Sequence, residues 1–257
     1  MQIEVIIEKK SHKLDAEEGK TILETLQEHG IHVLTAPCGG RGRCGKCTVE
    51  VEHMGEVLAC MTKVTDGMRI TIPEVQLRAQ KSKIAENGTV THYPADDGEG
   101  LDAACDIGTT TVVCHLIDGK TGEKLATVSE PSAQRSFGAD VLSRIQAAEA
   151  GKLEILKEQI IFQIAQMLRT LQKKTGRGEQ IQRLAVVGNT VMCHLFAGIS
   201  PVSIGVTPFM PQEFFGKEYT GEQLGLTDCR SVYIAPAVGG IVGGGVTSGL
   251  LGVGGEK

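Results

Sequence analysis

The sequence predicts two domains of different fold class: a small α+β domain at residues 1–75 and an α/β domain at residues 104–257. Three observations support this division. Short strand patterns and one short helix pattern fill the first range, whereas the second contains a long amphipathic helix pattern at 153–174. Residues 76–103 are polar and interrupted by glycine, with no periodic apolar face, which is typical of a linker. The 257 residues of the chain are enough for two domains of ordinary size.

The first domain is expected to alternate strands with a single helix. Residues 2–8 alternate in hydrophobicity as a strand does, and after a polar turn residues 13–14 continue as a second strand. A helix at 21–30 begins with the capping-box pattern T-x-x-E and stops at a glycine. Residues 47–52 alternate as a further strand, and 64–73 contain a turn and another strand.

A glycine-rich loop at 38–47 is the most informative local feature. Together with one later position it supplies four thiols, Cys38, Cys44, Cys47 and Cys60. Glycine accepts positive φ, so such a loop can wrap tightly and turn its N–H groups toward the sulfurs. Three cationic side chains lie on the same loop, Arg41, Arg43 and Lys46. An anionic iron–sulfur cluster needs such donors and charges, and C-x5-C-x2-C…C is one residue longer than the plant-type ferredoxin spacing. We therefore predict a [2Fe–2S] cluster.

Two other uses of these thiols were considered. Structural zinc sites usually combine paired C-x2-C or C-x4-C knuckles, and this chain has one such knuckle. Structural disulfides belong to oxidising compartments, and the N-terminus shows no signal-peptide pattern. Eight cysteines in such a chain indicate a reducing cytoplasm. The four remaining cysteines lie among apolar neighbours and are expected to be buried and inert: Cys105, Cys114, Cys193 and Cys229.

The order of elements and the four-cysteine motif resemble those of the [2Fe–2S] ferredoxin superfamily, and the resemblance covers the whole of residues 1–75. It implies the β-grasp ferredoxin fold. It also implies that all four cysteines are cluster ligands, which assigns Cys38, Cys44, Cys47 and Cys60 to the metal site.

The second domain opens with a strand, a hydroxyl-rich turn and a second strand at 103–118, followed by a third strand at 124–128. The turn carries an acidic residue, a glycine and threonines, a phosphate-cradling arrangement formed by Asp106, Gly108, Thr109 and Thr110. The carboxylate can orient Mg²⁺ through water, while the glycine permits close approach and the hydroxyl and N–H groups face phosphate oxygens. Short hydroxyl-rich hairpins are also common in β proteins without ligands.

A second polar turn strengthens the phosphate interpretation. After helical stretches at 140–145 and 153–174, a buried strand at 183–188 leads into a turn and a helix. The turn consists of Gly188, Asn189 and Thr190. Polar residues at the carboxyl end of a strand and beside a helix N-terminus are well placed to bind phosphate.

Five segments of the second domain, taken with the N-terminal unit, resemble the reductive activators of corrinoid proteins, a family of ferredoxin–ASKHA ATPases. The segments are 106–111, 134–141, 188–195, 208–209 and 236–243. The resemblance implies an α/β domain of ribonuclease H-like or actin-like architecture, corresponding to the first half of an ASKHA domain. It further implies Mg-ATP as a cofactor, a redox donor, and a corrinoid protein whose Co(II) centre accepts an electron from the cluster.

The chain departs from that family pattern in two places. It stops before the second phosphate motif and the adenosine-binding loop, and Gly245 stands where the family has an acidic residue. An ASKHA site closes around nucleotide between two subdomains, so half a site should bind ATP weakly. The expectation is therefore little ATPase activity from this chain alone, unless a second chain completes the ASKHA domain.

Composition limits the remaining possibilities. A formal net charge of −5 argues against general nucleic-acid affinity, and no apolar run reaches the roughly 20 residues that a membrane-spanning helix needs. A plain ferredoxin carrier with a non-catalytic docking domain is the alternative function, and a cluster-based redox sensor is a third. Acid–base catalysis is poorly supported, because His115 and His194 lie among apolar residues.

Overall fold

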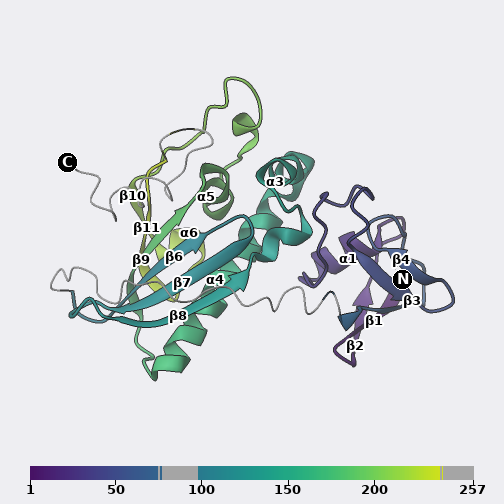
Figure 1. Cartoon of the computed structure of the whole chain (residues 1–257), viewed down its shortest axis with the longest axis horizontal. Helices are drawn as coiled ribbons and strands as arrows, with labels where there is room; N and C mark the ends of the chain where they lie inside the picture. Colours follow the sequence, from purple (N-terminus) through teal and green to yellow (C-terminus); the bar gives the residue numbers. More distant parts are fainter. Residues whose placement is uncertain (75, 77–97, 238, 240–257) are drawn as a thin grey trace. The chain divides into compact units, whose positions relative to one another are not determined.

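The structure is a computed structural model that describes residues 1–74, 76, 98–237 and 239. The chain forms two compact units, coloured along the sequence in Figure 1. The first unit comprises residues 1–82 together with 133–147, and the second comprises 83–132 together with 148–257.

A five-stranded mixed sheet forms the first unit. Its strands are β1 (Gln2–Ile7), β2 (Lys10–Asp15), β3 (Thr48–Val51), β4 (Gly55–Leu58) and β5 (Arg69–Thr71), in the order β2-β1-β5-β3-β4. The two central strands, β1 and β5, are parallel. This is the ferredoxin-like fold that the order of patterns predicted. Strand β4 was not predicted, because its residues are exposed or half-buried and show no alternation.

Helix α1 (Ile22–Glu28) covers the sheet and begins at the predicted capping box. The Thr21 hydroxyl accepts from the N–H of Glu24 at 3.2 Å, and the Glu24 carboxylate accepts from the N–H of Thr21 at 2.9 Å. Ile22, Leu23 and Leu26 are buried in the core of the unit. The Leu23 N–H donates to the Ala59 carbonyl at 3.0 Å, which ties the helix to the residue before Cys60.

The second unit is built on a six-stranded mixed sheet. Its strands are β6 (Leu101–Ile107), β7 (Thr111–Asp118), β8 (Lys124–Pro131), β9 (Ile181–Gly188), β10 (Lys217–Thr220) and β11 (Cys229–Ile234), in the order β10-β11-β9-β6-β7-β8. Strands β6 to β8 form the predicted antiparallel meander. Strands β6, β9 and β11 run parallel to one another. The expected linker range reaches residue 103, and β6 already begins at Leu101.

Helix α4 (Leu153–Thr175) packs on β7 and β8 through the predicted apolar stripe. Figure 1 shows it lying along the sheet. The stripe is buried at Leu156, Ile160, Ile161, Ile164, Met167, Leu168 and Leu171. Helix α5 (Thr190–Ala197) follows β9, and short helix α6 (Gly221–Leu224) precedes β11. The sequence patterns do not predict β10, β11 or α6. The ribonuclease H-like or actin-like assignment of this mixed sheet remains a proposal.

The 133–147 segment contains a 3₁₀ turn (Ala133–Ser136) and helix α3 (Val141–Ala147), close to the helix expected at 140–145. A kinked stretch (Ala148–Lys152) separates α3 from α4, and Gly151 within it has φ 83°. That left-handed residue interrupts the helical path, so α3 and α4 are two helices.

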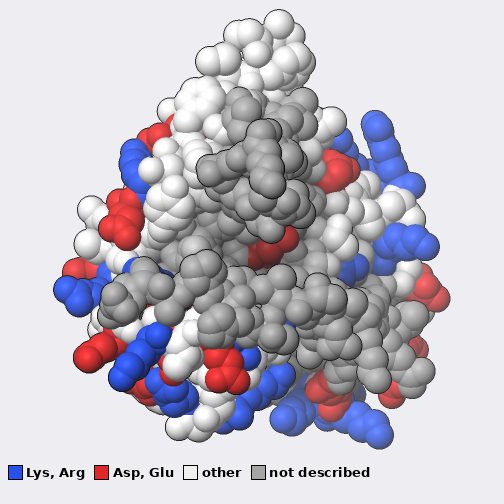
Figure 2. Space-filling model, turned by 60° about the vertical axis from the view of Figure 1, so that its left-hand side comes forward, with Lys and Arg blue, Asp and Glu red and all other residues white. Residues whose placement is uncertain are grey.

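Two surface properties complete the description. In the described part of the chain, no helix is both long enough and apolar enough to cross a membrane. On the face drawn in Figure 2, Lys and Arg side chains are interspersed with Asp and Glu.

Candidate metal centre and phosphate-binding turn

The four predicted cluster ligands come from three positions in the first unit. Cys38 and Cys44 lie on the loop between α1 and β3, with their Sγ atoms 3.3 Å apart. Cys47 immediately precedes β3, and Cys60 follows β4. Because β3 and β4 are paired antiparallel, Thr48 opposite Leu58, the positions of Cys47 and Cys60 are brought to the same end of that hairpin.

Backbone N–H groups of the loop point at the sulfurs. Burial raises the pKa of the Cys38 thiol, but hydrogen bonds from the Cys44 thiol and from the N–H groups of Cys44, Arg43 and Arg41 outweigh it and lower the pKa to about 6. Thiolate is the form that binds metal, so this loop stabilises the ligand state of Cys38.

For Cys60, the interactions that raise the pKa outweigh those that lower it. Burial and the neighbouring Cys47 thiol raise the pKa of Cys60 to about 12, against a lowering contribution from the Gly42 N–H. The interactions therefore sort the thiols into two pairs, Cys38 with Cys44 and Cys47 with Cys60. A cationic group bound between them would relieve the repulsion between the thiolates.

Glycine is required where this loop wraps. Four of its residues have left-handed φ values of 64°, 81°, 70° and 64°: Gly39, Gly40, Gly42 and Gly45. A Cβ on Gly42 would lie 2.6 Å from Met61 Sδ. The side chain of Met61 therefore sits directly against the loop backbone, and any larger residue at position 42 would displace one of them.

These residues fit a dinuclear iron–sulfur cluster. Four thiols in two pairs supply two ligands to each of two irons. Among the described residues, no group of three or more His, Cys, Asp or Glu side chains is placed to hold a single metal ion. The cationic side chains of Arg41, Arg43 and Lys46 are exposed on the same loop.

The predicted phosphate residues of the second unit are brought together at one sheet edge. Strands β6 and β9 are parallel neighbours, with Ile107 opposite Gly188, so both polar turns leave the same end of the sheet. The Asn189 side-chain amide donates to the Thr109 hydroxyl at 3.0 Å, which joins the two turns directly. The two polar turns are therefore neighbours in the structure, and phosphate binding by them stays a prediction.

The glycines of these turns allow close approach. A Cβ on Gly108 would lie 2.5 Å from the Thr111 carbonyl oxygen, and one on Gly188 would lie 2.6 Å from Ile107 Cγ1. The Thr110 carbonyl accepts from the Ser132 N–H at 2.9 Å, which fixes the turn to the end of β8.

The other polar groups have distinct roles. The Asn189 side chain caps α5 by accepting from the Met192 N–H at 2.9 Å, and the Thr190 hydroxyl donates to the Gly239 carbonyl at 2.6 Å. Asp106 is exposed at the end of β6, and the desolvation it still experiences raises the pKa of its carboxyl group. A nearby cation would counter this effect, because it stabilises the charged form of the Asp106 carboxylate.

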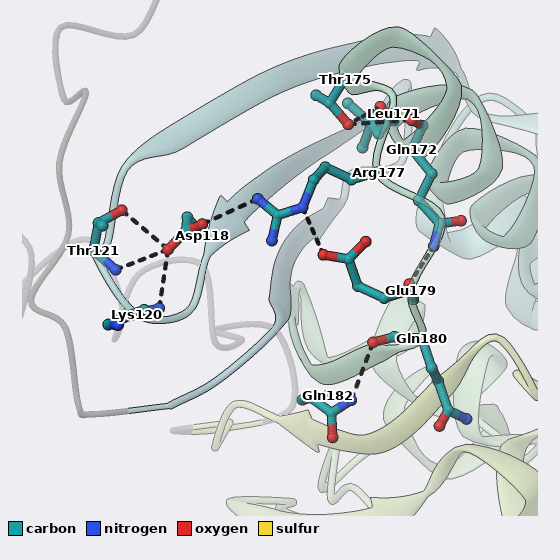
Figure 3. Close-up of polar contacts among 10 residues, drawn as sticks. All are labelled: Asp118, Lys120, Thr121, Leu171, Gln172, Thr175, Arg177, Glu179, Gln180 and Gln182. Atoms are coloured by element: carbon teal, nitrogen blue, oxygen red, sulfur yellow. Dashed lines mark hydrogen bonds and ion pairs between the residues drawn. The ribbon is translucent and has the colours of Figure 1, made fainter.

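A polar network at the opposite end of the same sheet is structural. Asp118 accepts from the N–H groups of Lys120 and Thr121 at 3.1 and 2.9 Å, and from Arg177 Nη1 at 3.1 Å (Figure 3). The Thr121 N–H and the Arg177 guanidinium are the main causes that lower the pKa of Asp118 to about 2. Arg177 also contacts Glu179, so the network fixes the β7–β8 turn beside the end of α4.

Some contacts of the metal loop had no signal in the sequence. The Gln76 side-chain amide donates to the Lys46 carbonyl at 2.6 Å, beside Cys47, from one residue beyond the predicted domain. The Gln27 amide on α1 donates to the Ser136 carbonyl at 2.9 Å. The four remaining cysteines are buried, as expected, and the Sγ atoms of Cys105 and Cys114 lie 2.8 Å apart.

Comparison with known families supports both halves of this description. Residues 4–74 match the model of the 2Fe-2S iron-sulfur cluster binding domain. Residues 101–256 match the RACo middle region. The chain belongs to the RACo family.

Two relatives place the chain more closely. The corrinoid activation enzyme RamQ of Eubacterium limosum is 26% identical over an alignment of 303 residues. The alignment includes 87% of this chain and 51% of RamQ. The chain thus spans about half the length of this curated relative. A solved structure described as a reductive activator for corrinoid, iron-sulfur protein is similar with a TM-score of 0.58 at 24% identity, covering 98% of this chain and 58% of that protein. The similarity to this solved structure supports the fold described above.

Proposed function

We propose that this protein is an electron-transfer protein of the corrinoid-activator type, in which a cluster on Cys38, Cys44, Cys47 and Cys60 delivers a low-potential electron to a Co(II) corrinoid protein. The observation that carries the proposal is the pair of thiol pairs on a glycine-rich loop, in a chain whose remaining length matches the RACo middle region. A redox donor must reduce the cluster first.

The chain's own groups set the conditions for that transfer. When bound, a [2Fe–2S] cluster supplies one-electron chemistry at low potential. The N–H groups of Arg41, Arg43 and Cys44 donate toward Cys38, and that of Gly42 donates toward Cys60. These donors and the loop cations stabilise negative charge on the sulfurs, whereas burial of Cys47 and Cys60 opposes it.

The turn at the ends of β6 and β9 is proposed to bind the phosphates of Mg-ATP. Asp106 would orient Mg²⁺ through water, and Gly108, Thr109, Thr110, Gly188, Asn189 and Thr190 would surround the phosphates. The direct Asn189–Thr109 contact supports this assignment. The strand order β8-β7-β6-β9-β11, with only β7 antiparallel to its neighbours among these central strands, supports a ribonuclease H-like or actin-like domain. In such a domain a second subdomain would close the site.

The decisive experiment is a single-turnover electron transfer. The anaerobically reduced protein, freed of excess dithionite, is mixed with a Co(II) corrinoid protein with and without Mg-ATP. The proposal expects the Co(II) EPR signal to decline as the cluster is reoxidised. A Cys38→Ala protein serves as the control, since it lacks a ligand. A cluster that stays reduced while the Co(II) signal persists under both conditions contradicts the proposal.

Nucleotide binding separates the proposal from its alternative, a plain ferredoxin carrier with a docking domain. Titration with a fluorescent ATP analogue and Mg²⁺ should show binding that Thr109→Val weakens. Thr121→Val is the matched control, because Thr121 is also a turn hydroxyl on this sheet but lies at the opposite end (Figure 3). Absence of binding favours the plain carrier.

A further inference from the structure

The 133–147 segment follows β8 in the sequence, inside the stretch that matches the RACo middle region, yet it packs within the first unit. Two of its residues, Ala139 and Phe137, contact the region around the first cluster ligand. The Ala139 N–H donates to the carbonyl of Pro37, the residue before Cys38, at 3.3 Å. A Cβ on Gly39, the residue after Cys38, would lie 3.2 Å from the Phe137 carbonyl oxygen. The segment therefore lies against the backbone on both sides of Cys38.

Two buried side chains hold the segment in that place. The Gln27 amide, on a side chain only 5% exposed, donates to the Ser136 carbonyl at 2.9 Å. Phe137 is 3% exposed, and its ring lies 6.3 Å from that of His32. The first contact comes from α1 and the second from His32, in the stretch between α1 and the metal loop, so the segment is tied to the elements that lead into the loop.

The segment is itself rigidly built. The fully buried Arg144 donates from Nε to the Gly138 carbonyl at 3.2 Å and from Nη1 to Gln134 Oε1 at 3.3 Å. A Cβ on Gly138 would lie 2.3 Å from Ser143 Cβ. The buried, hydrogen-bonded arginine fixes the turn between the 3₁₀ helix and α3. The backbone at Gly138 also lies so close to Ser143 that only glycine fits there. The surface that meets Pro37 and Gly39 is therefore preformed.

From these contacts we infer that the 133–147 segment sets the midpoint potential of the cluster held by the adjacent loop. Gln27 and Phe137 position the segment for this role. Solvent access and hydrogen bonds to the sulfurs set the potential of such a cluster. The reduced cluster carries more negative charge than the oxidised one, so water admitted to the loop stabilises the reduced form more. Loosening the segment should therefore raise the midpoint potential.

The test uses the cluster-loaded full chain and compares Gln27→Leu with the parent protein. We expect a midpoint potential above that of the parent, altered EPR g values, and faster loss of iron to a chelator. Gln172→Leu is the matched control, because the Gln172 amide also donates to a backbone carbonyl, that of Glu179, at 2.8 Å in the second unit (Figure 3). It should leave all three readouts at the parent values.

Every outcome decides the inference. A raised potential, or selective loss of the cluster with an unchanged circular dichroism spectrum, supports it, and a lowered potential contradicts it. A fully loaded Gln27→Leu protein with the parent's potential, g values and chelation rate overturns it. If Gln27→Leu does not fold, Phe137→Leu is measured with the same criteria. The inference rests on the cluster and uses no corrinoid protein or nucleotide, so it can fail while the proposed function stands.

Discussion

At the scale of single residues, the cysteines of this chain divide by what surrounds them. Burial raises the pKa of Cys38, but the Cys44 thiol and the N–H donors of the loop outweigh it and lower the pKa to about 6, whereas burial raises the pKa of Cys229 to about 12. Burial raises the pKa of the proposed ligand Cys60 as well, so position separates the two thiols: Cys38 has the Cys44 Sγ 3.3 Å away on the metal loop, whereas Cys229 lies in the second unit. Cys38→Ala should therefore lower the iron content well below the two irons per chain of a [2Fe–2S] protein, and Cys229→Ala should not. Iron and sulfide analysis of both variants checks this, and equal iron in the two would contradict the ligand assignment.

His32 provides a residue-scale test of packing around the metal loop. Burial lowers its pKa from 6.5 to about 4. The unfolded chain therefore binds a proton that the folded protein does not, and stability is lost as pH falls from about 6.5 to about 4. The depression of the pKa corresponds to at most about 3 kcal/mol.

The measurement is urea unfolding of the parent and of His32→Leu at several pH values. The difference between their free energies of unfolding should shift in favour of the variant as pH falls from 6.5 to 4. A difference that stays constant across this range would show that His32 is freely solvated.

At the scale of elements, the close approach of β6 and β9 depends on a missing side chain. A Cβ at position 188 would lie 2.6 Å from Ile107 Cγ1 and 3.0 Å from the Ile107 carbonyl oxygen. Gly188→Ala should therefore destabilise the second unit by about 1–3 kcal/mol, the usual cost of overpacking. Gly178→Ala is the control, because no atom lies within 4 Å of its added Cβ and its φ is not left-handed. Chemical denaturation of both variants measures the difference, and equal stabilities would refute the argument.

The first turn of α5 combines a structural and a proposed binding role in Asn189. Its Oδ1 caps the helix, and its Nδ2 donates to Thr109. Asn189→Ala should cost about 1 kcal/mol of stability, as should the cap removal Thr220→Ala on α6. Asn189→Asp keeps a capping oxygen but loses the donor and adds negative charge.

Nucleotide titration separates the two roles. Asn189→Asp should retain near-parent stability and weaken binding of an Mg-ATP analogue about tenfold or more, since a hydrogen bond to a charged group is lost. Thr220→Ala should bind as the parent does. Parent-like nucleotide affinity in Asn189→Asp would assign Asn189 to capping alone.

Sequence patterns predicted those elements whose signal is local. The T-x-x-E box of α1, the apolar stripe of α4 and the meander of β6 to β8 are all as expected. Strands β4 and β10 carry mostly exposed side chains, so their residues show no burial pattern to recognise. Their strand conformation comes from pairing with β3 and β11, which local sequence does not encode.

The same distinction holds for the site across the whole molecule. The cysteine spacing and the two polar turns are short-range motifs; the first predicted the 2Fe-2S domain that the family model matches, and phosphate binding by the second stays a prediction. The contact of Gln27 with Ser136 joins residues 109 positions apart, and the sequence around either residue contains no pattern that predicts it. Long-range packing of this kind decides which segments surround the metal loop, and it becomes visible only when the units are folded.

The central claim about the whole molecule is that this chain carries a redox-active [2Fe–2S] cluster. The most direct test is EPR of the anaerobically purified, dithionite-reduced protein, with iron and sulfide counted on the same sample. We predict an S = 1/2 signal with about two irons and two sulfides per chain. A silent spectrum from protein that contains zinc and no sulfide would contradict the account and remove the electron-transfer function with it.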